Sequence, residues 1–174
     1  MILGMTTSTF TLLHVLISLA GIGSGFIVVF GWLAGRRLGA WNAIFLFTTV
    51  LTSATGFLFP IKEITPGIKV GVISLVLLAL AILARYAFQL AGSWGRTYVV
   101  TAAMALYLNC FVGVVQAFEK VPALKALAPT QKEPPFLFAQ LILLAIFVAL
   151  TIVAAKRFSK VGPVAAERDS RRAA

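Results

Sequence analysis

The run FTLLHVLISLAGIGSGFIVVFGWL, from Phe10 to Leu33, decides the class of fold. It carries no formal charge, and a helix of this length spans the roughly 30 Å hydrocarbon core of a bilayer with some tilt. A secretory signal peptide has a positively charged start and a shorter apolar core. Phe10–Leu33 follows an uncharged segment and is longer than such a core, so we interpret it as a retained first membrane helix.

The composition of the whole chain also indicates an integral membrane protein. Hydrophobic residues make up 60% and charged residues 11%, whereas soluble proteins have about 25% charged residues. The 174 residues leave room for one bundle at roughly 20 residues per spanning helix. The net charge of +10 fits basic loops at the membrane surface, because no basic run is interleaved with aromatic residues. We therefore expect no nucleic-acid partner.

Four more apolar runs divide the remaining chain into helices. They are Trp41–Phe59, Val70–Ala84, Thr97–Phe118 and Phe136–Ala155. Val70–Ala84 is short, about 22 Å at 1.5 Å per residue, so Lys69 and Arg85 are expected to extend toward the two interfaces. The sequence predicts an all-α integral membrane bundle of five transmembrane helices over residues 1–158. Residues 159–174 are predicted to form a mobile basic cytoplasmic tail.

The stretch NCFVGVVQAFEKVPALKALAPTQKEPPF, from Asn109 to Phe136, departs most from plain apolar sequence. Within it, Val121–Ala128 has a proline near its start, apolar residues at helical spacing and Pro129 as a stop signal. This pattern predicts a short interfacial helix in the last outer loop.

Basic residues orient the predicted bundle. With the N-terminus outside, inner segments hold ten of the 15 Lys and Arg residues and outer segments hold five. The inner ones are Arg36, Arg37, Arg85, Arg96, Lys156, Arg157, Lys160, Arg168, Arg171 and Arg172, so every arginine lies inside. The positive-inside rule therefore favours a periplasmic N-terminus and a cytoplasmic C-terminus in a bacterial inner membrane.

Two phrases carry a resemblance to known membrane proteins. LHVLISLAGIGSG (residues 13–25) and FEKVPALKALAPTQKEPPF (residues 118–136) resemble small uncharacterised multi-span proteins of bacterial inner membranes. The likeness covers most of the chain and implies no particular activity. Leu13-His14 also resembles the start of the "LH" helix of some haem- or copper-handling membrane families. Because the chain has one histidine, it lacks their further ligands, and we expect no cofactor and no metal.

Polar side chains collect in the predicted outer half of the bundle. Counting about 1.5 Å per residue from the outer helix ends places His14 and Gln140 roughly 6 Å deep and Asn109 about 13 Å deep. Polar groups in hydrocarbon tend to face the bundle interior, and His14 is the side chain whose unperturbed pKa lies near neutrality. The predicted ligand-binding residues are His14, Ser18, Thr52, Thr55, Asn109, Gln116, Glu119 and Gln140.

Each of these residues also has a purely structural interpretation. Ser and Thr hydroxyls commonly bond helix carbonyls, and Asn or Gln joins helices with about 1 kcal/mol each. His14 would then reach headgroups, and Glu119 would sit at a solvated helix end. A second set, Gly21, Gly25, Gly31 and Gly35, forms two small-xxx-small spacings that predict close helix packing, within the chain or with another copy.

Two functional classes remain open from the sequence. The first is a non-enzymatic protein whose outward-facing polar pocket binds or moves a small lipophilic or weakly polar ligand. The second is a structural or accessory subunit of a larger membrane complex, or a homo-oligomer, with membrane lipid as its other partner. An enzyme is less supported, because Ser18 one turn from His14 is the sole nucleophile-base pair and such i, i+4 pairs arise easily by chance.

Overall fold

The computed structural model describes residues 2–59 and 66–160, and these residues are almost entirely helical. Their β-type pairing is one bridge between Ile2 and Met5. The elements are α1 (Thr7–Leu33), α2 (Gly39–Gly56), α3 (Pro66–Ile82), the π-helical turn η1 (Leu83–Ala87), α4 (Trp94–Lys120), α5 (Pro122–Leu127) and α6 (Pro134–Lys160). The predicted all-α class is confirmed.

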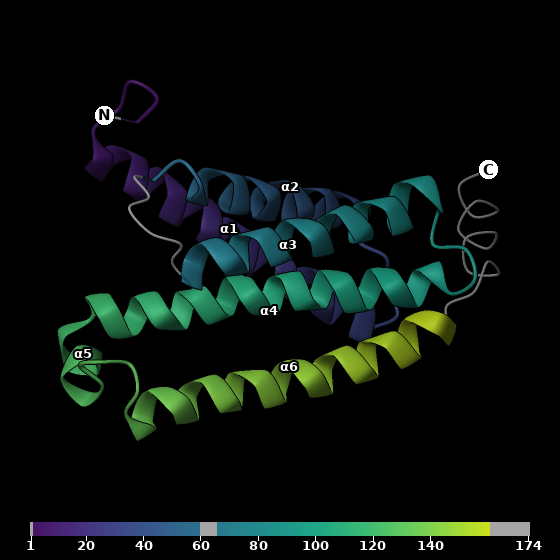
Figure 1. Cartoon of the computed structure of the whole chain (residues 1–174). Helices are drawn as coiled ribbons and strands as arrows, with labels where there is room; N and C mark the ends of the chain where they lie inside the picture. Colours follow the sequence, from purple (N-terminus) through teal and green to yellow (C-terminus); the bar gives the residue numbers. More distant parts are fainter. Residues whose placement is uncertain (1, 60–65, 161–174) are drawn as a thin grey trace.

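Within the described residues, the long helices α1, α2, α3, α4 and α6 run alternately in opposite directions along one bundle (Figure 1). Helix α1 pairs mainly with α2, while α4 packs against α3 and α6 and also touches α1 and α2. Accordingly, 39% of the residues in the most apolar part of α4 are buried, compared with 11% in the corresponding part of α6. Helix α4 is therefore the centre of the bundle, and α6 lies at its edge.

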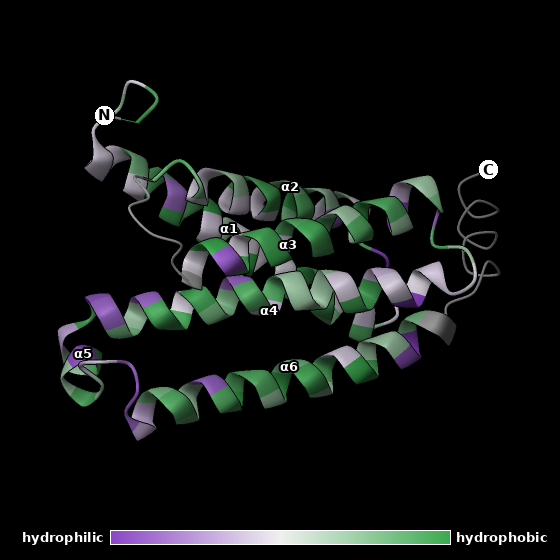
Figure 2. Ribbon diagram, in the orientation of Figure 1, coloured by the Kyte–Doolittle hydropathy of each residue, from purple (hydrophilic) through white to green (hydrophobic). Residues whose placement is uncertain are grey.

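Among the described residues, four helical segments are long and apolar enough to cross a membrane. They are Thr7–Leu33, Gly67–Ala87, Trp94–Lys120 and Pro134–Phe158. Apolar residues occupy the middle of the bundle and hydrophilic ones gather toward its ends (Figure 2). Large apolar side chains such as Leu16, Leu141 and Ile142 are more than half exposed, a surface that suits lipid rather than water. These features indicate a membrane protein.

Helix α2 is not among these four segments, because several polar residues dilute its hydropathy. Its 18 residues include Asn42 and two hydroxyl residues of the predicted site, Thr52 and Thr55. The fifth span therefore stays a prediction. So does the interfacial position of α5, although a short helix at Pro122–Leu127 is confirmed within the predicted Val121–Ala128.

A glycine in a left-handed conformation ends α1. Gly35 has a φ of +69°, a left-handed conformation that glycine adopts without steric cost. The amide of Gly35 donates to the carbonyl of Trp32 over 3.0 Å, and the amide of Arg36 donates to that of Gly31 over 2.8 Å. This pair of bonds is the Schellman motif, which satisfies the last carbonyls of a helix and turns the chain.

Several other helix ends differ from the sequence prediction; α2, for example, ends at Gly56 rather than Phe59. Helix α6 continues to Lys160, beyond the predicted Ala155. Helix α3 continues into the π-helical turn η1. The sequence does not predict this turn, because a π-helical turn accommodates one extra residue without changing the hydrophobic composition of the segment. Of the predicted tail, residues 159 and 160 belong to α6, and residues 161–174 lie outside the described residues.

Candidate functional site

The centre of the candidate site is a contact between His14 on α1 and Thr55 on α2. The His14 Nδ1 and Thr55 Oγ1 atoms are 2.8 Å apart. One turn deeper on α1, the Ser18 hydroxyl donates to the His14 carbonyl over 2.8 Å. Phe59 meets the imidazole edge to face, with 5.3 Å between ring centres, and Phe10 packs on Phe59 at 5.1 Å. The ring of His14 is thus held between a hydroxyl and an aromatic pair.

Thr52 and Asn109 extend this contact toward the middle of the bundle. Thr52 lies on α2 one turn before Thr55, and its buried Oγ1 has no hydrogen-bond partner among the described residues. Asn109 on α4 is 9% exposed, and its Nδ2 also has no partner in the described part of the chain. Unpartnered buried donors are uncommon in folded proteins, so both atoms mark candidate positions for a ligand.

Gly21 lets Asn109 approach the interface of α1 and α2. A Cβ atom on Gly21 would come within 3.2 Å of both Asn109 Nδ2 and Thr49 Oγ1, and within 3.3 Å of Thr48 Oγ1. The missing side chain at Gly21 therefore leaves room for the Asn109 side-chain amide of α4 and the Thr48 and Thr49 hydroxyls of α2 to lie on the same side of α1. Five predicted residues lie at successive turns of α1 and α2 or, for Asn109, beside Gly21 of α1, and we call them the polar seam: His14, Ser18, Thr52, Thr55 and Asn109.

Gln140 belongs to a different contact. It lies on α6, and its Nε2 donates to the carbonyl of Phe111 on α4 over 3.3 Å. Its Oε1 is buried and has no partner among the residues described. The structure therefore places Gln140 between α4 and α6, rather than with the side chains that α1 and α2 contribute to the polar seam.

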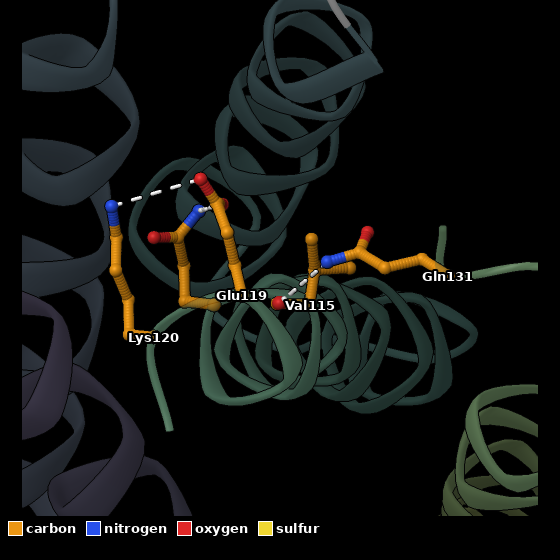
Figure 3. Close-up of polar contacts among 5 residues, drawn as sticks. Val115, Glu119, Lys120 and Gln131 are labelled. Carbon is orange, nitrogen blue, oxygen red and sulfur yellow. Dashed lines mark hydrogen bonds and ion pairs between the residues drawn. The ribbon is translucent and has the colours of Figure 1, made fainter. Parts of the chain in front are cut away.

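Gln116 and Glu119 lie on the exposed end of α4. The Gln116 Nε2 donates to Glu119 Oε2 over 3.3 Å, and Glu119 pairs with Lys120 at 3.6 Å. Figure 3 shows Glu119 and Lys120 together with Gln131, whose Nε2 donates to the Val115 carbonyl over 3.1 Å. An exposed ion pair contributes roughly 0–1 kcal/mol. Gln116 and Glu119, both predicted ligand-binding residues, therefore hydrogen-bond to each other at the helix end and lie outside the polar seam.

The loop between α5 and α6 is fixed by Glu133. Its carboxylate accepts hydrogen bonds from the Thr130 hydroxyl at 2.8 Å and the Thr130 amide at 3.1 Å, and from the Lys132 amide at 3.0 Å. Desolvation alone would raise the pKa of Glu133, but these bonds and its own backbone amide outweigh it and hold the pKa below its usual value. The carboxylate is therefore a structural part of the turn that starts α6.

The predicted packing glycines face partners within the same chain. A Cβ on Gly25 would lie 2.5 Å from Leu106 Cδ1, and one on Gly31 would lie 2.8 Å from Leu38 Cδ1. Together with Gly21, they serve the contacts of α1 with α2, α4 and the following turn. Gly35 is exposed and sits beyond α1, so the structure places it in the Schellman turn rather than in a helix contact.

Sequence reasoning missed a polar and aromatic cluster at the opposite end of the bundle. The Tyr98 hydroxyl on α4 donates to Asn42 Oδ1 on α2, and both residues are 0% exposed. The Trp32 and Tyr98 rings are 5.5 Å apart, and the guanidinium carbon of Arg85 lies 5.5 Å from the Tyr98 ring centre. The sequence does carry a signal here, because Asn42 is a polar residue within the apolar run Trp41–Phe59, but it belongs to the predicted inner half rather than to the outer polar group.

This cluster also ties α6 to α1. Arg157 on α6 donates through Nη1 to the carbonyl of Leu33, the last residue of α1. The guanidinium of Arg37 lies 4.7 Å from the centre of the Phe158 ring. A cation at a helix C-terminus is favourable because the helix dipole is negative there. We interpret the arginines at this end of the bundle as structural residues that hold α6 against the end of α1.

Comparison of the chain with protein-family models, with curated proteins and with solved structures finds no match. Function is therefore inferred from the side-chain arrangement of the chain itself.

Proposed function

We propose that this chain is a non-enzymatic protein of a bacterial inner membrane that binds or moves a small lipophilic or weakly polar ligand at the polar seam. The observation that carries the proposal is the Asn109 Nδ2 atom, which is buried where α4 meets α1 and α2 and has no partner among the residues that the structure describes. Leaving a buried donor without a partner costs about 1–3 kcal/mol. A ligand with a polar group would offset that cost.

The arrangement of the helix ends supports an outward-facing seam. His14 lies near the start of α1, at the same end of the bundle as α5 (Figure 1), and the loop around α5 contains lysines but no arginine. The arginines that flank α1, α4 and α6 lie at the other end. By the positive-inside rule, the arginine end faces the cytoplasm and the His14 end faces the periplasm.

Reporter fusions test this orientation and the fifth span. Fusions after Lys62 and Lys125 are expected to be active in the periplasm, and fusions after Arg36 and Lys160 in the cytoplasm. A cytoplasmic reporter at Lys62 would show that α2 does not cross the membrane. The reverse pattern at Arg36 and Lys160 would overturn the orientation.

Ligand binding is tested by purifying the protein in mild detergent and analysing an organic extract by mass spectrometry. We expect a reproducible bound compound in the wild type and its loss in Thr52→Val, Asn109→Leu and His14→Ala. Thr101→Val is the matched control, because Thr101 is also a helix threonine but its hydroxyl bonds to the Thr97 carbonyl at 2.7 Å. A protein without bound compound, or equal amounts in all variants, would contradict the proposal.

The same purification distinguishes the alternative of an accessory subunit. An accessory subunit that docks through its glycine faces needs those faces to be free, whereas Gly21 and Gly25 face side chains of α2 and α4 in this chain. A stoichiometric partner protein that co-purifies with the wild type and with Asn109→Leu alike would favour the subunit. A protein that purifies alone with its compound would favour the seam.

A further inference from the structure

The direction of the hydrogen bond between His14 and Thr55 follows from a second bond. The Thr55 hydroxyl donates its one proton to the Leu51 carbonyl at 2.6 Å, with the Thr52 carbonyl farther away at 3.2 Å. A hydroxyl whose proton is engaged offers only oxygen lone pairs to other groups. The 2.8 Å contact with His14 Nδ1 therefore requires Nδ1 to carry the hydrogen and donate.

This assignment fixes the chemistry of the other ring nitrogen. In a neutral imidazole with hydrogen on Nδ1, the Nε2 atom has a free lone pair and is an acceptor. His14 is half-buried, and the contact of its Nδ1 with Thr55 orients the ring, so the Nε2 acceptor has a defined direction. A group that pairs with it must supply a hydrogen.

The surroundings of the imidazole are aromatic and have space on the side of α2. Phe59 lies edge to face with the ring at 5.3 Å. At Gly56, even an added Cβ would remain 3.9 Å from the His14 Cε1 atom, an ordinary contact distance. Cε1 is the carbon between the two nitrogens, so the absence of a larger side chain at Gly56 leaves that edge of the ring uncrowded. Aromatic side chains pack favourably on other rings.

We propose that the ligand of the polar seam is a lipophilic hydroxyl donor of the phenol or hydroquinone class. Its hydroxyl donates to His14 Nε2, and its ring packs beside Phe59. This inference rests on the proposed function and narrows it, because a ligand with acceptors alone would leave Nε2 unpaired. Ethers and esters of the same size are therefore expected to bind less well.

The single histidine makes the assignment directly measurable. Protein labelled with ¹⁵N-histidine in detergent micelles gives one imidazole, and its nitrogen resonances report which nitrogen carries the hydrogen. We expect hydrogen on Nδ1 in the wild type and a redistribution toward Nε2 in Thr55→Val. Thr48→Val is the matched control, because its hydroxyl bonds to the Ile44 carbonyl on the same helix. A wild-type ring with hydrogen on Nε2 would refute the inference.

The ligand class is tested with 2-naphthol and 2-methoxynaphthalene, which share a ring system and differ in the O–H donor. We expect saturable binding of 2-naphthol with a shift of the Nε2 resonance, and roughly tenfold weaker binding of the ether, the effect of one lost hydrogen bond. Binding of both at equal affinity without a shift of Nε2 would refute the donor class and leave the proposed function standing. If neither probe binds and the purified wild type contains no compound, the proposed function fails and this inference fails with it.

Discussion

A single added methyl group on α1 tests the packing of the bundle. Gly25 is buried, and a Cβ there would lie 2.5 Å from Leu106 Cδ1 and 3.0 Å from Phe45 Cδ2. Leu106 and Phe45 are 0% and 1% exposed, so neither side chain has free space into which to move. At Gly23, two residues away, an added Cβ would meet nothing within 4 Å. The change from glycine to alanine is thus the same at both positions, and only the contact differs.

The expected magnitude combines two opposing effects. Alanine is more favourable than glycine inside a helix by about 0.8–1.0 kcal/mol, and overfilling a packed core costs about 1–3 kcal/mol. Gly23→Ala is therefore expected to stabilise the protein by about 1 kcal/mol. Gly25→Ala is expected to be between neutral and about 2 kcal/mol less stable than the wild type. The difference between the two variants isolates the steric cost, about 1–3 kcal/mol.

Unfolding by sodium dodecyl sulfate in mixed micelles measures this difference. Tryptophan fluorescence, to which the buried Trp32 contributes together with Trp41 and Trp94, reports loss of the tertiary structure, and far-UV circular dichroism reports the helices. Equal free energies of unfolding for Gly23→Ala and Gly25→Ala would refute the close approach of α1 to α4. A Gly25→Ala protein more stable than Gly23→Ala would do so even more directly.

Three further changes probe the two ends of the bundle. Tyr98→Phe leaves the buried Asn42 carbonyl oxygen without its donor, so the free energy of unfolding in mixed micelles should fall by about 1–3 kcal/mol; an unchanged value would contradict the bond. Arg157→Met removes the donor to the last carbonyl of α1 and should cost about 0.5–1 kcal/mol in the same assay, whereas Lys156→Met, an exposed neighbour, should cost less. The ionised carboxylate of Glu133 stabilises the turn before α6, and its pKa is lowered. Its stabilising contribution is therefore fully present above the ordinary glutamate pKa and is lost as the pH falls through the lowered pKa. The NMR shifts of the Thr130 and Lys132 backbone amides, which donate to this carboxylate, should titrate below the usual glutamate range, and Glu133→Gln should abolish that titration.

The sequence by itself determined the class of protein and much of the helix order, because hydropathy and turn residues act locally. The apolar runs predicted each long helix, and Leu33 was correctly placed at the end of α1. Proline and apolar spacing were sufficient to predict the short helix α5. Helix α2 carried a weaker signal, since its polar residues lower its hydropathy.

Only the tertiary structure decided which polar residues meet. Asn109 and Gln116 lie two turns apart on one face of α4, yet Asn109 is buried and Gln116 is exposed. A helix face is covered only where a neighbouring helix lies at the same height, and the pattern within one helix does not encode that height. The bond between Tyr98 and Asn42 joins residues 56 positions apart, and it depends on the register of α2 against α4. Helix formation is governed by local sequence, whereas the relative register of packed helices is governed by the shapes of several surfaces at once.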